Sequence, residues 1–172
     1  MSALLTEGSD DLYGADSGAI FSPGRTYRYR LWRQWRPGAR LVYVMLNPST
    51  ADAERNDPTI ERCQRRASML GYTGIEVVNL FALRSPNPNA LLTHPDPIGP
   101  DNDEAIRAAC AGATTVICAW GSHRAVGVRA DHVLRLVRET GRVAHYLMRN
   151  ADGNPCHPLY QPYGCEPKAW PG

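Results

Sequence analysis

The sequence predicts an α/β fold: a three-layer α/β/α domain with a mostly parallel, four-stranded central sheet and an additional N-terminal edge strand or hairpin. Two observations predict it. Apolar runs of strand length alternate with stretches of helical periodicity, at residues 39–46, 74–80, 114–119 and 145–148, which is typical of parallel sheets with crossover helices. Several of these runs also stop abruptly at polar residues, as strands do where their carboxyl ends form a binding site.

The first elements are predicted by alternation and by helix-capping residues. Residues 27–35 (YRYRLWRQW) alternate with a period of two and predict a strand, which we expect at an edge of the sheet. A turn at Pro37-Gly38 then leads into the first central strand. Asp57 can cap a helix whose first position is Pro58, and this helix should end at Gly71.

The second half of the chain repeats the pattern of strand and helix. A strand at 74–80 (GIEVVNL) is followed by a long loop rich in proline, at residues 85–100. A helix at 101–111, a strand at 114–119, a helix at 124–140 and a short strand at 145–148 come next. The rest is rich in Gly and Pro and predicts irregular structure.

Length and composition are those of one globular domain. The chain has 172 residues with 43% hydrophobic residues, enough to bury a real core. We expect residues 1–22, which are polar and acidic, to form a flexible N-terminal arm, and residues 23–172 to form a single α/β domain. The arm lacks the features of a secretory signal, and no apolar run approaches the roughly 20 residues that cross a bilayer. We therefore expect a cytoplasmic protein with no membrane partner.

Basic residues gather in one segment, although the net charge is only +2. The segment 25–40 interleaves arginines with aromatic residues, as Arg25, Arg28, Arg30, Arg33, Arg36 and Arg40 among Tyr27, Tyr29, Trp32 and Trp35. Such a mixture suits phosphate neutralisation and base stacking. A solvated amphipathic hairpin would have the same composition, so both interpretations stay open.

Five cysteines occur without the spacing of a metal or cluster site. They contain no CxxC motif and stand at positions 63, 110, 118, 156 and 165. Cys63, Cys110 and Cys118 fall in predicted helices or strands and should be small buried hydrophobic residues. As an alternative, Cys156, His157 and Cys165 could together supply three ligands to a metal ion. We expect no metal and no cofactor.

Four polar segments follow the four central strands. They are Asn47-Pro48-Ser49-Thr50, the single residue Asn79, Trp120-Gly121-Ser122, and the segment 154–160 (NPCHPLY). Because ligands of open α/β sheets bind at the carboxyl ends of the strands, we expect these segments to converge on one cleft.

The order and content of these segments resemble the motifs of the uracil-DNA glycosylase superfamily. The segments that carry the resemblance are MLNPST, EVVNLFALR, VICAWGSHRAVG and NPCHPLY, across residues 39–160. The whole chain also resembles a bacterial family known only as a domain of unknown function, with hallmarks MLNPSTAD, NDPT, VNLFALR, AWG and HPLY. The first resemblance implies a glycosylase-like fold and hydrolysis of an N-glycosidic bond on a flipped or modified base. The partner would be nucleic acid, DNA in preference to RNA, or a nucleotide.

The resemblance also implies roles for individual residues. Asn47 would position the attacking water, and His157 would stabilise the departing base or contact a phosphate. Asn79 would bind the base edge, because an amide offers a donor and an acceptor. Pro48 and Ser49 would shape the base pocket. Each residue also has a structural alternative. Asn47 could brace its loop through local hydrogen bonds, Asn79 could satisfy backbone groups at the end of the strand, and His157 could bond to a backbone carbonyl.

Further residues would complete the site. Phe81 could stack on the base or belong to the core. Gly121 and Ser122 could bind a phosphate at the start of the next helix, or Ser122 could simply cap that helix. Leu159 and Tyr160 could fill the gap left by a flipped base, or pack against the core.

Departures from the glycosylase motifs keep other functions open. The first motif lacks the aspartate and histidine of the fastest uracil enzymes, and the last motif has an extra residue. The main alternative is a non-catalytic nucleic-acid-binding module. A second alternative is a small-molecule nucleoside hydrolase or transferase.

Overall fold

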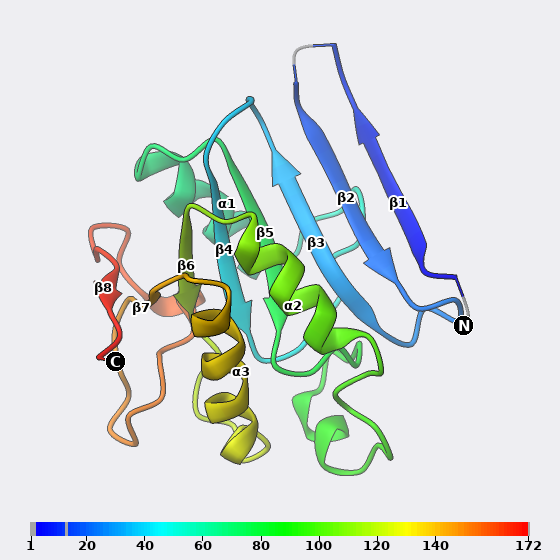
Figure 1. Ribbon diagram of the computed structural model, residues 1–172, viewed down its shortest axis with the longest axis vertical. Coiled ribbons are helices and arrows are strands. Elements are labelled where there is room, and N and C mark those ends of the chain that lie inside the picture. The colour runs from blue at the N-terminus through cyan, green and yellow to red at the C-terminus, as the bar shows by residue number, and fades with distance from the viewer. Residues whose placement is uncertain (1–2, 13, 172) are drawn as a thin grey trace.

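A single eight-stranded sheet runs through the molecule in the order β1-β2-β3-β5-β4-β6-β7-β8 (Figure 1). The computed structural model describes residues 3–12 and 14–171. The strands are β1 Leu5–Asp10, β2 Asp16–Phe21, β3 Arg28–Gln34, β4 Arg40–Met45, β5 Gly74–Asn79, β6 Thr115–Cys118, β7 Ala144–Tyr146 and β8 Lys168–Ala169.

The sheet is mixed, and its antiparallel pairings outnumber the parallel ones. Four pairings are antiparallel, β1/β2, β2/β3, β3/β5 and β7/β8, whereas β4/β5, β4/β6 and β6/β7 are parallel. The expected mostly parallel, four-stranded, glycosylase-like sheet is therefore wrong. The expected edge strand is also misplaced, because β3 lies between β2 and β5.

The additional strands carry little sequence pattern. β1 (LTEGSD) is exposed along nearly all of its length, so no alternation of apolar residues marks it. Both β1 and β2 lie in the segment 1–22, for which we expected an arm. β8 has two exposed residues within the irregular C-terminal part. Backbone pairing to a neighbouring strand, rather than hydrophobic patterning, defines these elements.

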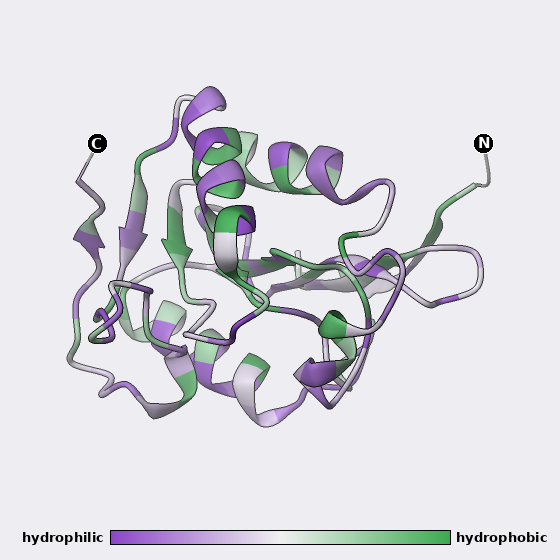
Figure 2. Ribbon diagram, turned by 90° about the horizontal axis from the view of Figure 1, so that it is seen from below, coloured by the Kyte–Doolittle hydropathy of each residue, from purple (hydrophilic) through white to green (hydrophobic). Residues whose placement is uncertain are grey.

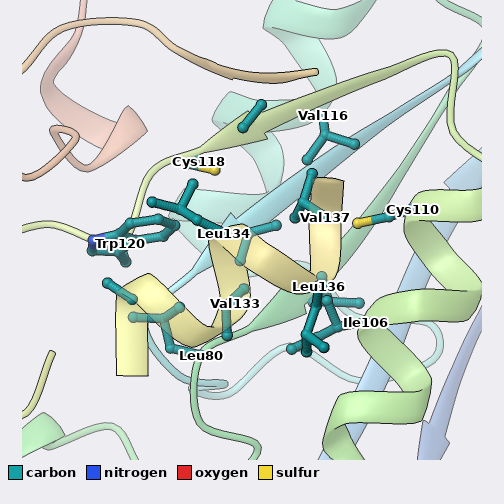
Figure 3. Packing of buried hydrophobic residues seen from close by; sticks show 14 of the residues in the cluster. Leu80, Ile106, Cys110, Val116, Cys118, Trp120, Val133, Leu134, Leu136 and Val137 are labelled. Carbon is teal, nitrogen blue, oxygen red and sulfur yellow. The ribbon is translucent and has the colours of Figure 1, made fainter. Parts of the chain in front are cut away.

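Helices cover both faces of the sheet (Figure 2). Helix α1 (Pro58–Met69) lies on one face, and helices α2 (Asn102–Ala111) and α3 (Gly127–Glu139) lie on the other. Alternate residues of β4 supply the two cores, as the pleat of a strand requires: Val42 and Val44 join the cluster of α2 and α3, whereas Leu41 and Tyr43 join that of α1. Figure 3 shows the first cluster, in which side chains of α3 pack among residues of α2 and β6.

The predicted Asp57 cap and the predicted buried cysteines agree with the structure. The side chain of Asp57 accepts a hydrogen bond from the Ile60 amide at 2.9 Å, which fixes the first turn of α1. Cys63, Cys110 and Cys118 are fully buried free thiols. Burial raises the pKa of the Cys110 thiol to about 12.

Two short 3₁₀-helices complete the described chain, η1 at Pro88–Leu92 and η2 at Pro158–Tyr160. None of the helices in the described ranges is both long and apolar enough to cross a membrane.

Candidate functional site

A pocket of about 210 Å³ lies beyond the carboxyl ends of β4 and β5. Its wall includes four of the residues singled out from the sequence, Asn47, Ser49, Asn79 and His157. Trp120 also lines it, with its indole Nε1 donating to Oδ1 of Asn154 at 3.2 Å. Segments that are far apart in the chain therefore meet at one cavity.

The side chain of Asn79 is buried in this wall without a partner. Asn79 ends β5 and is 1% exposed. Neither its Oδ1 nor its Nδ2 has a hydrogen-bond partner among the described residues. A buried amide left unpaired costs about 1–3 kcal/mol for each unsatisfied group, and such groups in folded proteins are explained by strain, by a functional role, or by a bound water or ion. Both ends of this amide are thus available to a ligand.

The backbone around Asn79 is, by contrast, held firmly. Nδ2 of Asn102 donates to the carbonyls of Asn79 and Leu80 at 3.0 and 3.1 Å. Nε of Arg129 donates to the same Leu80 carbonyl at 2.8 Å, and Arg129 forms an ion pair with Asp103. Hydrogen bonds therefore fix the backbone at the end of β5, whereas the polar atoms of the Asn79 side chain have no partner among the described residues.

Asn47 braces the loops beside the pocket. Its Nδ2 lies within hydrogen-bond distance of the carbonyls of Pro48, Leu83 and Ser85, at 3.0, 3.3 and 3.1 Å. The bracing alternative is therefore present in the structure. Its Oδ1 has no hydrogen-bond partner in the described part of the chain, so this acceptor remains for water or ligand.

His157 presents a neutral ring. Its Nδ1 accepts a hydrogen bond from the Leu159 amide at 3.2 Å, so the proton of the neutral ring lies on Nε2. Burial lowers the pKa of His157, and the nearby carboxylate of Asp57 opposes this effect. At neutral pH the ring is therefore a donor through Nε2–H.

Several residues of the pocket wall were not predicted from the sequence. Arg28, from β3, lines the pocket although we had placed it in a phosphate-binding or solvated segment. Ser85, Pro86 and Pro88, from the proline-rich loop, also line it. No local pattern marks these residues, because their position depends on contacts between distant segments.

Other predicted residues lie outside the pocket. Phe81 is 5% exposed and packs in the core, which was one of its two interpretations. The Gly121 amide donates to the Pro155 carbonyl at 2.8 Å. The Ser122 hydroxyl donates to Oδ1 of Asp152 at 3.0 Å. Helix α3 starts only at Gly127, so these groups do not stand at its N-terminus.

The last predicted pair lies in η2, next to His157. Leu159 is half-buried and Tyr160 is 81% exposed. Tyr160 therefore does not pack against the core.

The segment 25–40 is mostly integrated into the sheet. Arg30 makes a bidentate contact with the buried Glu76, at 2.7 to 3.1 Å, and Arg33 donates to Asn56 and to loop carbonyls. Arg30 and Arg33 are therefore engaged by the protein itself, whereas Arg36 of the same segment is exposed. Phosphate binding by this segment stays a prediction.

A further basic and aromatic surface lies along α1. An open groove of about 700 Å³ is lined by Arg62, Arg65, Tyr163 and Trp35. The guanidinium of Arg62 stacks at 4.1 Å from the centroid of the Tyr163 ring. The groove includes Pro58 and the pocket includes Thr59, so both hollows border the first turn of α1.

The alternative metal ligands are engaged in other contacts. Sγ of Cys156 is 2.8 Å from Oδ1 of Asn150, and Sγ of Cys165 is 3.1 Å from the Leu147 carbonyl. Within the described residues, no three His, Cys, Asp or Glu side chains are placed to hold a metal ion.

Comparison with known proteins gives one match. The model of the family described as "Protein of unknown function (DUF1643)" matches residues 28–159, a range that includes Arg28, Asn47, Asn79 and His157. No curated protein and no solved structure matches the chain. Because the family model covers more than half of the 172 residues, the chain belongs to the DUF1643 family.

Proposed function

We propose that the pocket binds the base of a nucleic acid or nucleotide and supports hydrolysis of the N-glycosidic bond of a flipped or modified base, in DNA in preference to RNA. The observation that carries this proposal is the buried, unpartnered amide of Asn79 in the pocket wall. An amide matches the edge of a heterocyclic base, which also offers donors and acceptors side by side.

The chemistry assigns one task to each polar group. Water attacks C1′ of the sugar, the bond from C1′ to the base nitrogen breaks, and the electron pair leaves with the base. Oδ1 of Asn47, which has no hydrogen-bond partner among the described residues, accepts a hydrogen bond from that water. An amide is too weak a base to take a proton from this water. The water would therefore lose its proton as the new C1′–O bond forms, and the departing base or solvent would receive that proton. Nε2–H of His157 donates to the oxygen on which negative charge develops.

The dimensions favour a base over a larger ligand. The pocket volume of about 210 Å³ lies below the range of roughly 300–1,000 Å³ typical of drug-sized ligands. The rest of a polynucleotide would then lie outside, and the groove along α1 offers Arg62, Arg65 and Tyr163 for its phosphates and bases. Tyr160, which is exposed and lies three residues after His157, would act as the wedge.

Two alternatives predict different outcomes. A non-catalytic nucleic-acid-binding module would bind oligonucleotides with steep salt dependence but release no base. A small-molecule nucleoside hydrolase or transferase would act on free nucleosides without affinity for DNA. The small pocket accommodates the base in all three cases, so the substrate panel must separate them.

The test incubates the protein with single- and double-stranded oligonucleotides that carry uracil or other modified bases, and with free nucleosides. Mass spectrometry measures the released base. We expect release from an oligonucleotide, a rate lowered about 100- to 1,000-fold in His157→Ala, and loss of base binding in Asn79→Leu. His145→Ala, outside the pocket, is the matched control and should act like wild type. Release that is unchanged in both site variants would overturn the proposal.

A further inference from the structure

Arg28 is the least satisfied of the buried arginines. It lies on β3 and is 2% exposed. Its Nη1 donates to the Ala51 carbonyl at 2.8 Å, and its Nε is buried without a partner. No carboxylate forms an ion pair with it within the described ranges. This guanidinium lines the pocket.

The other buried arginines are better compensated. Arg33 donates to one side-chain oxygen and three carbonyls. Arg66 donates to three carbonyls and lies against the ring of Tyr163. Arg129 forms an ion pair with Asp103. Arg66 also has a buried Nε without a partner among the described residues, so what distinguishes Arg28 is its single acceptor combined with the lack of an ion pair.

The charges near Arg28 do not neutralise it. Asp57 and Asp52 act on it favourably, and Arg84 and Arg33 act against it. Both carboxylates are already used locally: Asp57 accepts from the Ile60 amide at 2.9 Å, and Asp52 accepts from the amides of Glu54 and Arg55 at 3.0 and 2.8 Å. Burial lowers the pKa of Arg28 to about 10, so it stays charged at neutral pH.

A guanidinium carries five N–H donors and no acceptor. Placing such a charge in a protein interior without a counter-charge is costly, and a buried group with a shifted pKa in a cleft is a candidate for a functional site. The neighbouring His157 adds a further donor through Nε2–H, because its Nδ1 is occupied. The wall thus presents a cation and a neutral donor, and it also contains the carboxylate of Asp57, whose Oδ1 accepts a hydrogen bond from the Ile60 amide.

We infer that the pocket is selective for an anionic ligand, with Arg28 as the specificity-determining residue that binds a negatively charged oxygen beside the ring edge held by Asn79. This inference rests on the proposed base-binding role, and it adds the charge of the ligand. The oxygen can belong to a phosphate of a nucleotide or to a carboxylate on the ring. Both accept the parallel N–H groups of a guanidinium in the same way.

Calorimetric titration with four probes tests the inference. The probes are uracil, uracil 6-carboxylate, deoxyuridine monophosphate and inorganic phosphate. We expect the wild-type protein to bind the preferred anionic ring compound at least about tenfold more tightly than uracil, the factor that one charge-assisted hydrogen bond supplies. The carboxylate and the monophosphate distinguish the two sources of negative charge.

Variants test whether the preference for anionic ligands depends on Arg28. Arg28→Met should bring the affinity for the anionic probe down to that for uracil, whereas Arg55→Met removes the same charge from an exposed site of the nearby loop and should leave the ratio unchanged. If Arg28→Met does not fold, Arg28→Lys retains the charge without the planar fork and should retain only part of the preference. Equal binding of uracil and its anionic analogues by wild type overturns the inference whatever the variants do.

The outcomes separate this inference from the proposed function. Equal binding of neutral and anionic rings leaves base binding standing and removes the role of Arg28. Binding of inorganic phosphate without any ring compound supports Arg28 and removes base binding. Failure of all four probes to bind overturns both.

Discussion

Replacing Asn79 by leucine should stabilise the folded protein while it abolishes ligand binding. The amide is 1% exposed, and both of its polar atoms lack a partner among the described residues. Folding therefore removes the amide from water without replacing its hydrogen bonds. Leucine has a similar size and carries no polar atom that needs one.

The magnitude follows from the burial of the amide. An unsatisfied buried polar group costs about 1–3 kcal/mol in mutational series, so we expect the free energy of unfolding of Asn79→Leu to rise by about that amount. In a domain of this size each kcal/mol shifts Tm by roughly 2–4 °C. Urea denaturation followed by circular dichroism measures the change, and an unaltered m-value would show that the unfolded state is unaffected.

Asn102 provides the matched control. It is another fully buried amide at the same strand end, but its Nδ2 donates to the carbonyls of Asn79 and Leu80. Asn102→Leu leaves the Asn79 carbonyl without this donor, which costs about 1–3 kcal/mol, and it also removes the Asn102 Oδ1, which is itself buried without a partner among the described residues. The gain in stability should therefore be smaller in Asn102→Leu than in Asn79→Leu. A loss of more than about 1 kcal/mol in Asn79→Leu would show that its amide is paired in the folded protein, and would refute the reasoning.

Two further predictions concern a pKa and a surface. Because burial lowers the pKa of His157, its imidazole C–H resonances should titrate below the ordinary value of 6.5. The unfolded chain therefore takes up the proton first as the pH falls. The contribution of the neutral ring to the free energy of unfolding is complete above pH 6.5 and declines below it. A midpoint above 6.5 in an NMR titration would contradict this cause. Arg65→Gln in the groove along α1 should weaken single-stranded DNA binding and reduce the slope of log affinity against log salt by about 0.7, one phosphate contact, whereas Arg135→Gln on α3 should not; equal slopes in fluorescence anisotropy would exclude the groove.

The sequence was sufficient to predict the elements that have strong hydrophobic periodicity. The predicted strand at 74–80 corresponds to β5 at Gly74–Asn79, and the helix capped by Asp57 corresponds to α1. Burial on both faces of β5 and the local cap geometry are encoded within a few neighbouring residues. The exposed β1 has no such local pattern, and its place in the sheet depends on pairing with β2.

One informative residue in the predicted strand could have improved the fold prediction. Glu76 interrupts an apolar run, and a charge inside a buried strand needs a partner of opposite sign. The structure supplies Arg30 from the adjacent β3. An arginine-rich strand elsewhere in the sequence was therefore an indication that β3 pairs with β5 and does not lie at the edge of the sheet.

The direction of β3 also explains why Arg28 was missed. If β3 had run parallel to β5, its first residue would lie at the opposite edge of the sheet from Asn79, the last residue of β5. The two strands are antiparallel, with Leu31 opposite Val77, and the Arg28 amide donates to the Ala82 carbonyl at 3.0 Å. The start of β3 is thereby brought to the carboxyl end of β5. The same antiparallel pairing that overturned the predicted sheet thus places a buried cation in the wall of the pocket that holds Asn79, where a parallel arrangement would have left the amide without it.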